Sequence, residues 1–163
     1  MIKTVYWDAN IFHALLAKEP GRVDVCQKIM DAAIRGDLQI YTSAVTFVEV
    51  VWIKGLDRLD PKHEDEIQKF FGHRFIRLIM CDRGIAGEAR ALLWRFPKLK
   101  PKDAIHVASA LSQPIDTMHS YDDDDLVPLS GQLGNPPLTI CHPTWDDPPQ
   151  PPPPAPPEPA LGI

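Results

Sequence analysis

Short apolar segments, rich in β-branched and aromatic residues, alternate along the chain with longer segments in which apolar residues return every three or four positions. The first pattern is typical of buried strands, and the second is typical of helices packed on a core. The expected strands are residues 2–7, 38–41, 75–80, 115–119 and 138–141. The expected helices are residues 9–17, 23–35, 44–54, 61–71, 83–96 and 101–111. This alternation predicts an α/β fold with a mainly parallel sheet covered on both faces.

Capping residues support several of these helix boundaries. Gly36 and Gly55 each follow an apolar helical pattern and are suited to ending a helix. Ser43 and Asp82 precede such patterns and can accept hydrogen bonds from the first free N–H groups. Pro101 is tolerated at the start of the helix over residues 101–111.

The composition changes near residue 143. Residues 1–142 have the mixture of apolar and charged positions expected of one globular domain with its own core. Residues 143–163 contain the run QPPPPAPPEPA, which cannot pair into a sheet or continue a helix. We expect this part to be an extended, disordered and solvated tail rather than a recognition motif.

Charge and cysteine content narrow the possible functions. The net charge of −5 argues against binding nucleic acid by overall electrostatics, so a nucleic-acid enzyme of this composition would need a metal to offset its acids locally. Apolar runs fall well short of the ~20 residues that span a bilayer, and the first ten residues lack a signal-peptide core. The three cysteines form no CxxC pair. We therefore expect a cytoplasmic protein with reduced thiols and no membrane partner.

Acidic residues occur next to apolar elements at four places. Asp8 directly follows the first strand, Glu49 lies in the helix after the second, and Asp103 lies in the first turn of the helix over residues 101–111. Residues 122–125 are four consecutive aspartates after the fourth strand. Asp103 alone could simply complement a helix dipole, but ligands of open α/β sheets bind beyond the carboxyl ends of the strands. Carboxylates gathered there, without basic partners at most of the four places, indicate a Mg²⁺ or Mn²⁺ site.

The segments VYWDANIF and SAVTFVEV resemble two motifs of the PIN-domain nucleases, in particular the VapC-type toxins of bacterial toxin–antitoxin pairs. The first is VYWDANIF, in which Asp8 ends a strand and Asn10 follows two positions later. The second is SAVTFVEV, which supplies Ser43 and Thr46 before the helical Glu49.

Two later segments resemble the remaining motifs in the same order. PKDAIHVASAL supplies Asp103, and HSYDDDDL places Ser120 two positions before Asp122. Over about residues 1–142, the resemblance implies a three-layer α/β/α sandwich and a metal-dependent endoribonuclease. It also implies a homodimer and a small antitoxin partner.

The expected site combines the motif acids with part of the aspartate run. We expect four catalytic acids, Asp8, Glu49, Asp103 and Asp122, and a metal held by Asp8, Asp103, Asp122 and Asp125. Within the run, alternating side-chain directions favour Asp122 as a ligand. A turn that buries Leu126 and Val127 would carry Asp125 inward as a further contributor, with residues 123 and 124 solvated.

Other polar residues near the acids have open roles. Asn10, Ser43 and Ser120 are expected to support the acids, with Asn10 either orienting a ligand water or capping a helix. The basic residues Lys98, Lys100 and Lys102 could contact RNA phosphates or form a solvated loop. His106 is expected to pack at a helix edge rather than bind a ligand.

Two alternative functions remain open from the sequence. A catalytically idle PIN-like binding module would keep the same fold. A phosphatase of the haloacid-dehalogenase type also carries an aspartate after its first strand, but it needs a second acid where this chain has Asn10. Metal-dependent cleavage of RNA by the purified protein separates the nuclease from the idle module.

Overall fold

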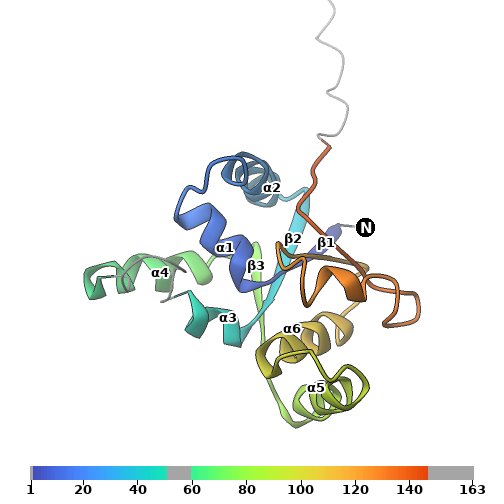
Figure 1. The fold of residues 1–163 in the computed structure, drawn as a ribbon. Coiled ribbons are helices and arrows are strands. Elements are labelled where there is room, and N and C mark those ends of the chain that lie inside the picture. Colours follow the sequence, from blue (N-terminus) through green and yellow to red (C-terminus); the bar gives the residue numbers. More distant parts are fainter. Residues whose placement is uncertain (1, 51–59, 147–163) are drawn as a thin grey trace, which may run out of the picture.

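A computed structural model describes residues 2–50 and 60–146. Its centre is a five-stranded, fully parallel sheet in the order β3-β2-β1-β4-β5 (Figure 1). The strands are β1 (Lys3–Trp7), β2 (Leu38–Ser43), β3 (Ile76–Ile79), β4 (Thr117–His119) and β5 (Thr139–Cys141). The predicted α/β fold with a parallel sheet is confirmed.

Helices cover both faces of the sheet and complete three layers. Helices α1 and α2 lie on one face, and α5 and α6 lie on the other (Figure 1). The helices are α1 (Ala9–Leu16), α2 (Val23–Arg35), α3 (Ala44–Glu49), α4 (Glu64–Phe71), α5 (Arg83–Arg95) and α6 (Pro101–Leu111), with short 3₁₀ turns η1 (Pro61–His63) and η2 (Val127–Leu129). The expected α/β/α sandwich is therefore present.

The central strand β1 separates two apolar cores. Tyr6 is completely buried among residues of α5 and α6, whereas Trp7 is completely buried among residues of α1 and α2. Successive side chains of a strand point to opposite faces, so these two aromatic residues serve different cores. This explains why β1 is apolar along its length rather than alternating.

Several predicted helix ends are observed. Gly36 ends α2 in the left-handed conformation with φ of 90°, which glycine adopts without steric cost. Ser43 caps α3 by accepting a hydrogen bond from the Val45 N–H, and Asp82 caps α5 by accepting one from the Ile85 N–H. The predicted continuation of α3 to residue 54 and its end at Gly55 lie outside the described residues.

Two strand boundaries differ from the sequence prediction by two residues, and the others agree to within one residue. Strand β2 extends to Ser43 instead of ending at residue 41, because Thr42 and Ser43 still pair with β3. Strand β4 begins at Thr117 instead of residue 115, since Ile115 donates its N–H to the Gln113 carbonyl in a turn.

The end of the described chain packs against the domain. Trp145 lies against the core of α1 and α2, and the Lys3 ammonium lies 5.0 Å from the centre of its ring. This packing falls within residues 143–163, the predicted tail, of which residues 147–163 lie outside the described part. In the described ranges, no helix is both long enough and apolar enough to cross a membrane.

Candidate metal centre at the carboxyl edge of the sheet

Asp8 lies at the carboxyl end of the central strand and caps the helix that follows. Its Oδ1 atom accepts hydrogen bonds from the N–H groups of Asn10, at 3.1 Å, and Ile11, at 3.3 Å. Only 3% of the residue is exposed. Burial raises the pKa of Asp8 to about 6, although the nearby His106 and a hydrogen bond from Ser120 act in the opposite direction. Asp8 therefore positions the start of α1 and contributes buried negative charge to this edge of the sheet.

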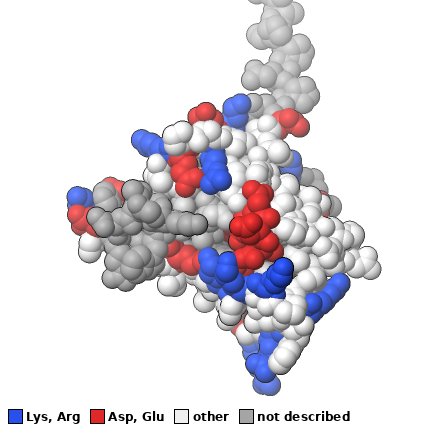
Figure 2. Space-filling view, in the orientation of Figure 1, with Lys and Arg blue, Asp and Glu red and all other residues white. Residues whose placement is uncertain are grey.

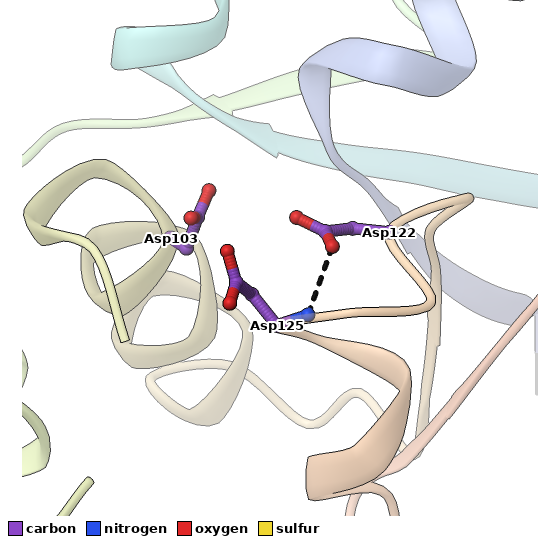
Figure 3. Close-up of side chains that lie close together, drawn as sticks. All are labelled: Asp103, Asp122 and Asp125. Atoms are coloured by element: carbon purple, nitrogen blue, oxygen red, sulfur yellow. Dashed lines mark hydrogen bonds between the residues drawn. The ribbon is translucent and has the colours of Figure 1, made fainter. Parts of the chain in front are cut away.

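Three carboxylates from two segments converge beside this edge. Asp103 projects from the first turn of α6, and Asp122 and Asp125 project from the loop after β4 (Figure 3). One carboxylate oxygen from each lies within 4.8 Å of the other two. Oxygen atoms at this spacing can coordinate one cation after small side-chain movements.

The aspartate run turns so that only two of its members join this group. The Oδ1 atom of Asp122 accepts hydrogen bonds from the N–H groups of Asp124, at 3.2 Å, and Asp125, at 2.9 Å. This turn brings Asp125 back toward Asp103 (Figure 3). Asp123 instead pairs with the exposed His142 at 2.7 Å, and its side chain is 63% exposed.

Asp103 carries the clearest sign of a missing partner. The residue is 3% exposed, and its buried Oδ2 atom has no hydrogen-bond partner among the described residues. Burial raises the pKa of Asp103, and repulsion from the Asp122 carboxylate raises it further. The positive charge of Lys102 acts in the opposite direction. A buried carboxylate oxygen without a partner is costly unless the acid is protonated or binds a cation. The all-oxygen donor set of this group fits Mg²⁺ or Mn²⁺.

Glu49 is compensated within the protein. Its Oε2 atom lies 2.7 Å from Nε2 of His106, and its Oε1 atom lies 3.1 Å from Nζ of Lys102. Burial raises the pKa of Glu49, but the hydrogen bond from His106 and the charges of His106 and Lys102 outweigh burial and leave the pKa below its usual value. Glu49 is thus kept ionised by two partners from α6.

The expected supporting residues form a scaffold for the loop after β4. Asn10 accepts a hydrogen bond from the Tyr121 N–H at 2.9 Å and donates one to the Ser120 hydroxyl at 3.3 Å. Ser120 is buried and accepts a hydrogen bond from the Asp122 N–H at 3.0 Å. Asn10 and Ser120 together fix the backbone that presents Asp122. Ser43, in contrast, contacts this site only indirectly, by capping α3.

Asp122 and Asp125 of this group line an open cleft of about 660 Å³, together with Glu49. Acidic residues gather at the centre of this face and basic residues lie beside them (Figure 2). Lys100 and Lys102 line the cleft, whereas Lys98 does not. Lys100 forms an ion pair with Asp125, and Lys102 lies 3.9 Å from Asp103 in addition to its contact with Glu49.

The group of converging carboxylates does not include every residue that was expected to bind the metal. Among the described residues, the group within 4.8 Å contains Asp125 and does not contain Asp8. Asp8 uses its Oδ1 atom for the helix cap, and its role as a metal ligand stays a prediction. His106 is fully buried and bridges Glu49 to the Tyr6 hydroxyl, rather than only packing at a helix edge.

Other residues of the cleft were not singled out in the sequence. Arg22, Glu19 and Tyr121 line it together with the carboxylates. Tyr121 could have been suspected because it directly precedes Asp122. No sequence pattern indicated that Arg22 and Glu19 lie at the cleft, because their position depends on how the connection between α1 and α2 folds.

The fold and this site define an α/β protein with an acidic cleft at the carboxyl edge of its parallel sheet. The model of the PIN domain family matches residues 5–127, so the chain belongs to that family. The match spans β1 to η2 and includes all of the acids discussed above. No curated protein matches the chain in sequence.

Solved structures share this fold at low sequence identity. A toxin–antitoxin complex from Klebsiella pneumoniae is 23% identical, with a TM-score of 0.54 over 74% of this chain and 88% of that one. The Mycobacterium tuberculosis toxin VapC20, which cleaves the sarcin–ricin loop, is 14% identical, with a TM-score of 0.59 over 74% and 91%. VapBC2 from Rickettsia felis, solved with a DNA fragment from its promoter, is 14% identical, with a TM-score of 0.57 over 85% and 97%.

Proposed function

We propose that this protein is a Mg²⁺- or Mn²⁺-dependent endoribonuclease and the toxin of a toxin–antitoxin pair. The observation that carries the proposal is the convergence of Asp103, Asp122 and Asp125, together with the buried Oδ2 atom of Asp103, which has no partner within residues 2–50 and 60–146. Membership of the PIN domain family and the fold shared with VapC toxins support the same activity.

The metal would be held by these three aspartates. When bound, it would supply Lewis-acid stabilisation of the phosphodiester and lower the pKa of water. Asp8 and Glu49 add negative charge beside the group, and Glu49 is kept ionised by His106 and Lys102.

Lysine side chains at the edge of the cleft would hold the RNA. Lys100 and Lys102 present ammonium groups that can contact phosphates on either side of the bond to be cut. Because both lysines already pair with carboxylates, they would provide local attraction on an acidic protein without making it bind nucleic acid generally.

RNA cleavage by the purified protein tests this proposal. Transfer, ribosomal and messenger RNA are each tested as substrates, and at least one should be cut in Mn²⁺ or Mg²⁺ and left intact in a chelator. Asp103→Asn should lower the rate about 100-fold or more, since it removes a ligand of the proposed cation. Asp116→Asn is the matched control, because Asp116 is exposed at the opposite end of β4. Cleavage that persists in the chelator would rule out the metal mechanism.

A small antitoxin is part of the same proposal. The similar fold in the toxin–antitoxin complex from Klebsiella pneumoniae supports this partner. Expression of this protein alone should arrest growth, and Asp103→Asn should relieve the arrest at equal protein level. Normal growth with abundant soluble wild-type protein would exclude the toxin role. The homodimer stays a prediction, which light scattering of the purified protein measures.

The alternatives from the sequence are less well supported. In a phosphatase of the haloacid-dehalogenase type, a second acid would act where Asn10 stands, but the Asn10 side chain is engaged by Tyr121 and Ser120. An idle binding module has no need for three carboxylates facing one another at a cleft, since their repulsion only destabilises it.

A further inference from the structure

One wall of the cleft carries an arginine whose guanidinium lies over an aromatic ring. The guanidinium carbon of Arg22 is 4.3 Å from the centre of the Tyr121 ring, the distance of a close cation–π contact. Arg22 still exposes 46% of its side chain, and both residues line the cleft. The guanidinium therefore lies against Tyr121, while the Arg22 side chain remains partly exposed at the cleft.

Several contacts hold this pair in place. The Tyr121 hydroxyl contacts Sγ of the buried Cys26 at 3.7 Å, and the edge of the His142 ring packs against Tyr121 with centres 5.2 Å apart. The Tyr121 N–H donates to Asn10. On the outer side, Glu19 binds Nη1 of Arg22 at 3.1 Å. The guanidinium is thus oriented before any ligand binds, which lowers the entropy cost of using it.

The pair is next to the proposed metal ligands. Tyr121 and Asp122 are consecutive, so their Cα atoms are about 3.8 Å apart. Lys100 and Lys102 lie in the same cleft and belong to the segment that carries Asp103. A nucleotide chain with its scissile phosphate at the carboxylates would therefore reach Arg22 within a short distance.

We propose that Arg22, supported by Tyr121, is a stacking platform for an unpaired nucleobase beside the scissile phosphate. This inference rests on the proposed nuclease function and specifies its substrate as single-stranded at that position. Nucleobases stack on guanidinium planes and aromatic rings, and an unpaired base is required because a paired base does not offer its face. The substitutions below distinguish stacking from a phosphate contact by Arg22, whose guanidinium also pairs with Glu19.

Lysine and glutamine substitutions separate stacking from charge. Arg22→Lys keeps the charge and removes the planar group, whereas Arg22→Gln removes the charge as well. Binding is measured by fluorescence anisotropy with oligoadenylate and with an abasic ribose-phosphate oligomer of equal length and charge. All proteins carry Asp103→Asn, so that the proposed nuclease does not cut the probe. Arg74→Lys is the matched control, because Arg74 is exposed before β3, at the opposite edge of the sheet.

Base stacking predicts a specific pattern of affinities. The parent protein should bind oligoadenylate roughly 5- to 100-fold more tightly than the abasic probe, the range expected for stacking on one base. Arg22→Lys and Arg22→Gln should both reduce this ratio about fivefold or more, and Arg74→Lys should leave it unchanged.

Three results would overturn the platform. The first is a parent protein that binds the two probes with nearly equal affinity, and the second is an affinity ratio that Arg22→Lys preserves. The third is a loss of affinity for both probes in Arg22→Gln alone, with a salt dependence of binding lower by about one in slope, which identifies a phosphate contact. Cleavage by the protein without Asp103→Asn is measured separately in Mn²⁺. Base-dependent binding without cleavage would overturn the nuclease and retain the platform, whereas cleavage with Arg22-independent binding would overturn the platform alone.

Discussion

His106 on α6 binds Glu49 at the end of α3, with Nε2 of the histidine 2.7 Å from Oε2 of the glutamate. The other ring nitrogen, Nδ1, lies 2.8 Å from the Tyr6 hydroxyl, which also accepts a hydrogen bond from the Ser43 N–H at 3.0 Å. This pattern is satisfied when Tyr6 donates to Nδ1 and Nε2–H donates to Glu49. A buried chain of hydrogen bonds therefore connects β1 and the start of α3 to a carboxylate in the cleft.

Removing the Tyr6 hydroxyl should weaken both the fold and this connection. Tyr6→Phe leaves the Ser43 N–H and His106 Nδ1 without their buried partner, and we expect a loss of about 1–3 kcal/mol in the free energy of unfolding. Urea denaturation measures this loss. Tyr41→Phe on β2 is the matched control, since the Tyr41 hydroxyl makes no hydrogen bond within the described ranges. Equal effects of the two changes would contradict the proposed chain.

Lys100 should compete with a cation for the three aspartates. Its ammonium pairs with Asp125, and it lies close enough to Asp103 and Asp122 for their charges to raise its pKa further. Lys100→Met removes this competing charge, so Mn²⁺ should bind severalfold more tightly in a titration calorimeter. Lys98→Met removes an equal charge outside the cleft and should leave the affinity at the wild-type value. Weaker Mn²⁺ binding by Lys100→Met would show that the lysine supports the metal site instead.

The regular elements of this fold could be predicted because their signals are local. The apolar run before Asp8 and the caps at Gly36 and Asp82 each depend on neighbouring residues only. The extension of β2 to Ser43 could not be predicted, because it depends on pairing with β3, more than 30 residues away.

The sequence indicated which acidic residues lie near the site, but it did not indicate which basic residues pair with them. Strand order places Asp8 and Asp122 at one edge of the sheet, so their proximity follows from topology. The pairing of Glu49 with His106 and Lys102 depends on how α3 meets α6, which no short sequence pattern encodes. The sequence therefore did not indicate the basic partners of Glu49.

His119 should make stability depend on pH. The Nδ1 atom of His119 accepts a hydrogen bond from Nε1 of the buried Trp7 at 3.1 Å. Burial lowers the pKa of His119 from 6.5 to about 4, with a smaller contribution from the charge of Lys3. Because the unfolded chain binds this proton more readily, the stability present above pH 6.5 is lost as the pH falls toward 4.

The variant His119→Asn isolates this effect. The difference between the two pKa values corresponds to a loss on the order of 3 kcal/mol, which the variant should lack while its amide oxygen can still accept from Trp7. Urea denaturation at several pH values down from about pH 8 measures both proteins. Asp8 acts in the opposite direction, since its pKa is raised to about 6, but it is common to both and cancels in the difference. Parallel stability curves for the two proteins would contradict the role of His119.

Asp103 should destabilise the metal-free protein. Two carboxylates about 4 Å apart repel by up to ~4 kcal/mol at an effective dielectric near 20, so Asp103→Asn should raise the free energy of unfolding by an amount within this limit. The pKa of Asp103 is raised, so its destabilising effect grows as the pH rises through that pKa and should disappear in acid.

Binding of Mn²⁺ should reverse this destabilisation. Mn²⁺ at about 100 times its Kd should raise the free energy of unfolding of the wild type by roughly 2.7 kcal/mol and that of the variant by little. Thermal melts of both proteins, with Asp116→Asn as the control, test the three statements. A wild-type melting temperature indifferent to Mn²⁺ would argue against the cation site.

The four consecutive aspartates should differ sharply in importance. Asp122→Asn keeps the side-chain oxygen that accepts the N–H groups of Asp124 and Asp125, so the turn should survive while one charge of the carboxylate group is lost. We expect Mn²⁺ affinity to fall about tenfold or more, which corresponds to ~1.4 kcal/mol, with a smaller fall for Asp125→Asn. Asp123→Asn removes an equal charge from an exposed side chain that pairs only with His142 among the residues the structure describes, and its affinity should stay close to that of the wild type. Calorimetric titration with Mn²⁺, followed by RNA cleavage rates, ranks the variants. If Asp123→Asn lowered Mn²⁺ affinity more than Asp122→Asn does, the turn would present a different carboxylate to the cation.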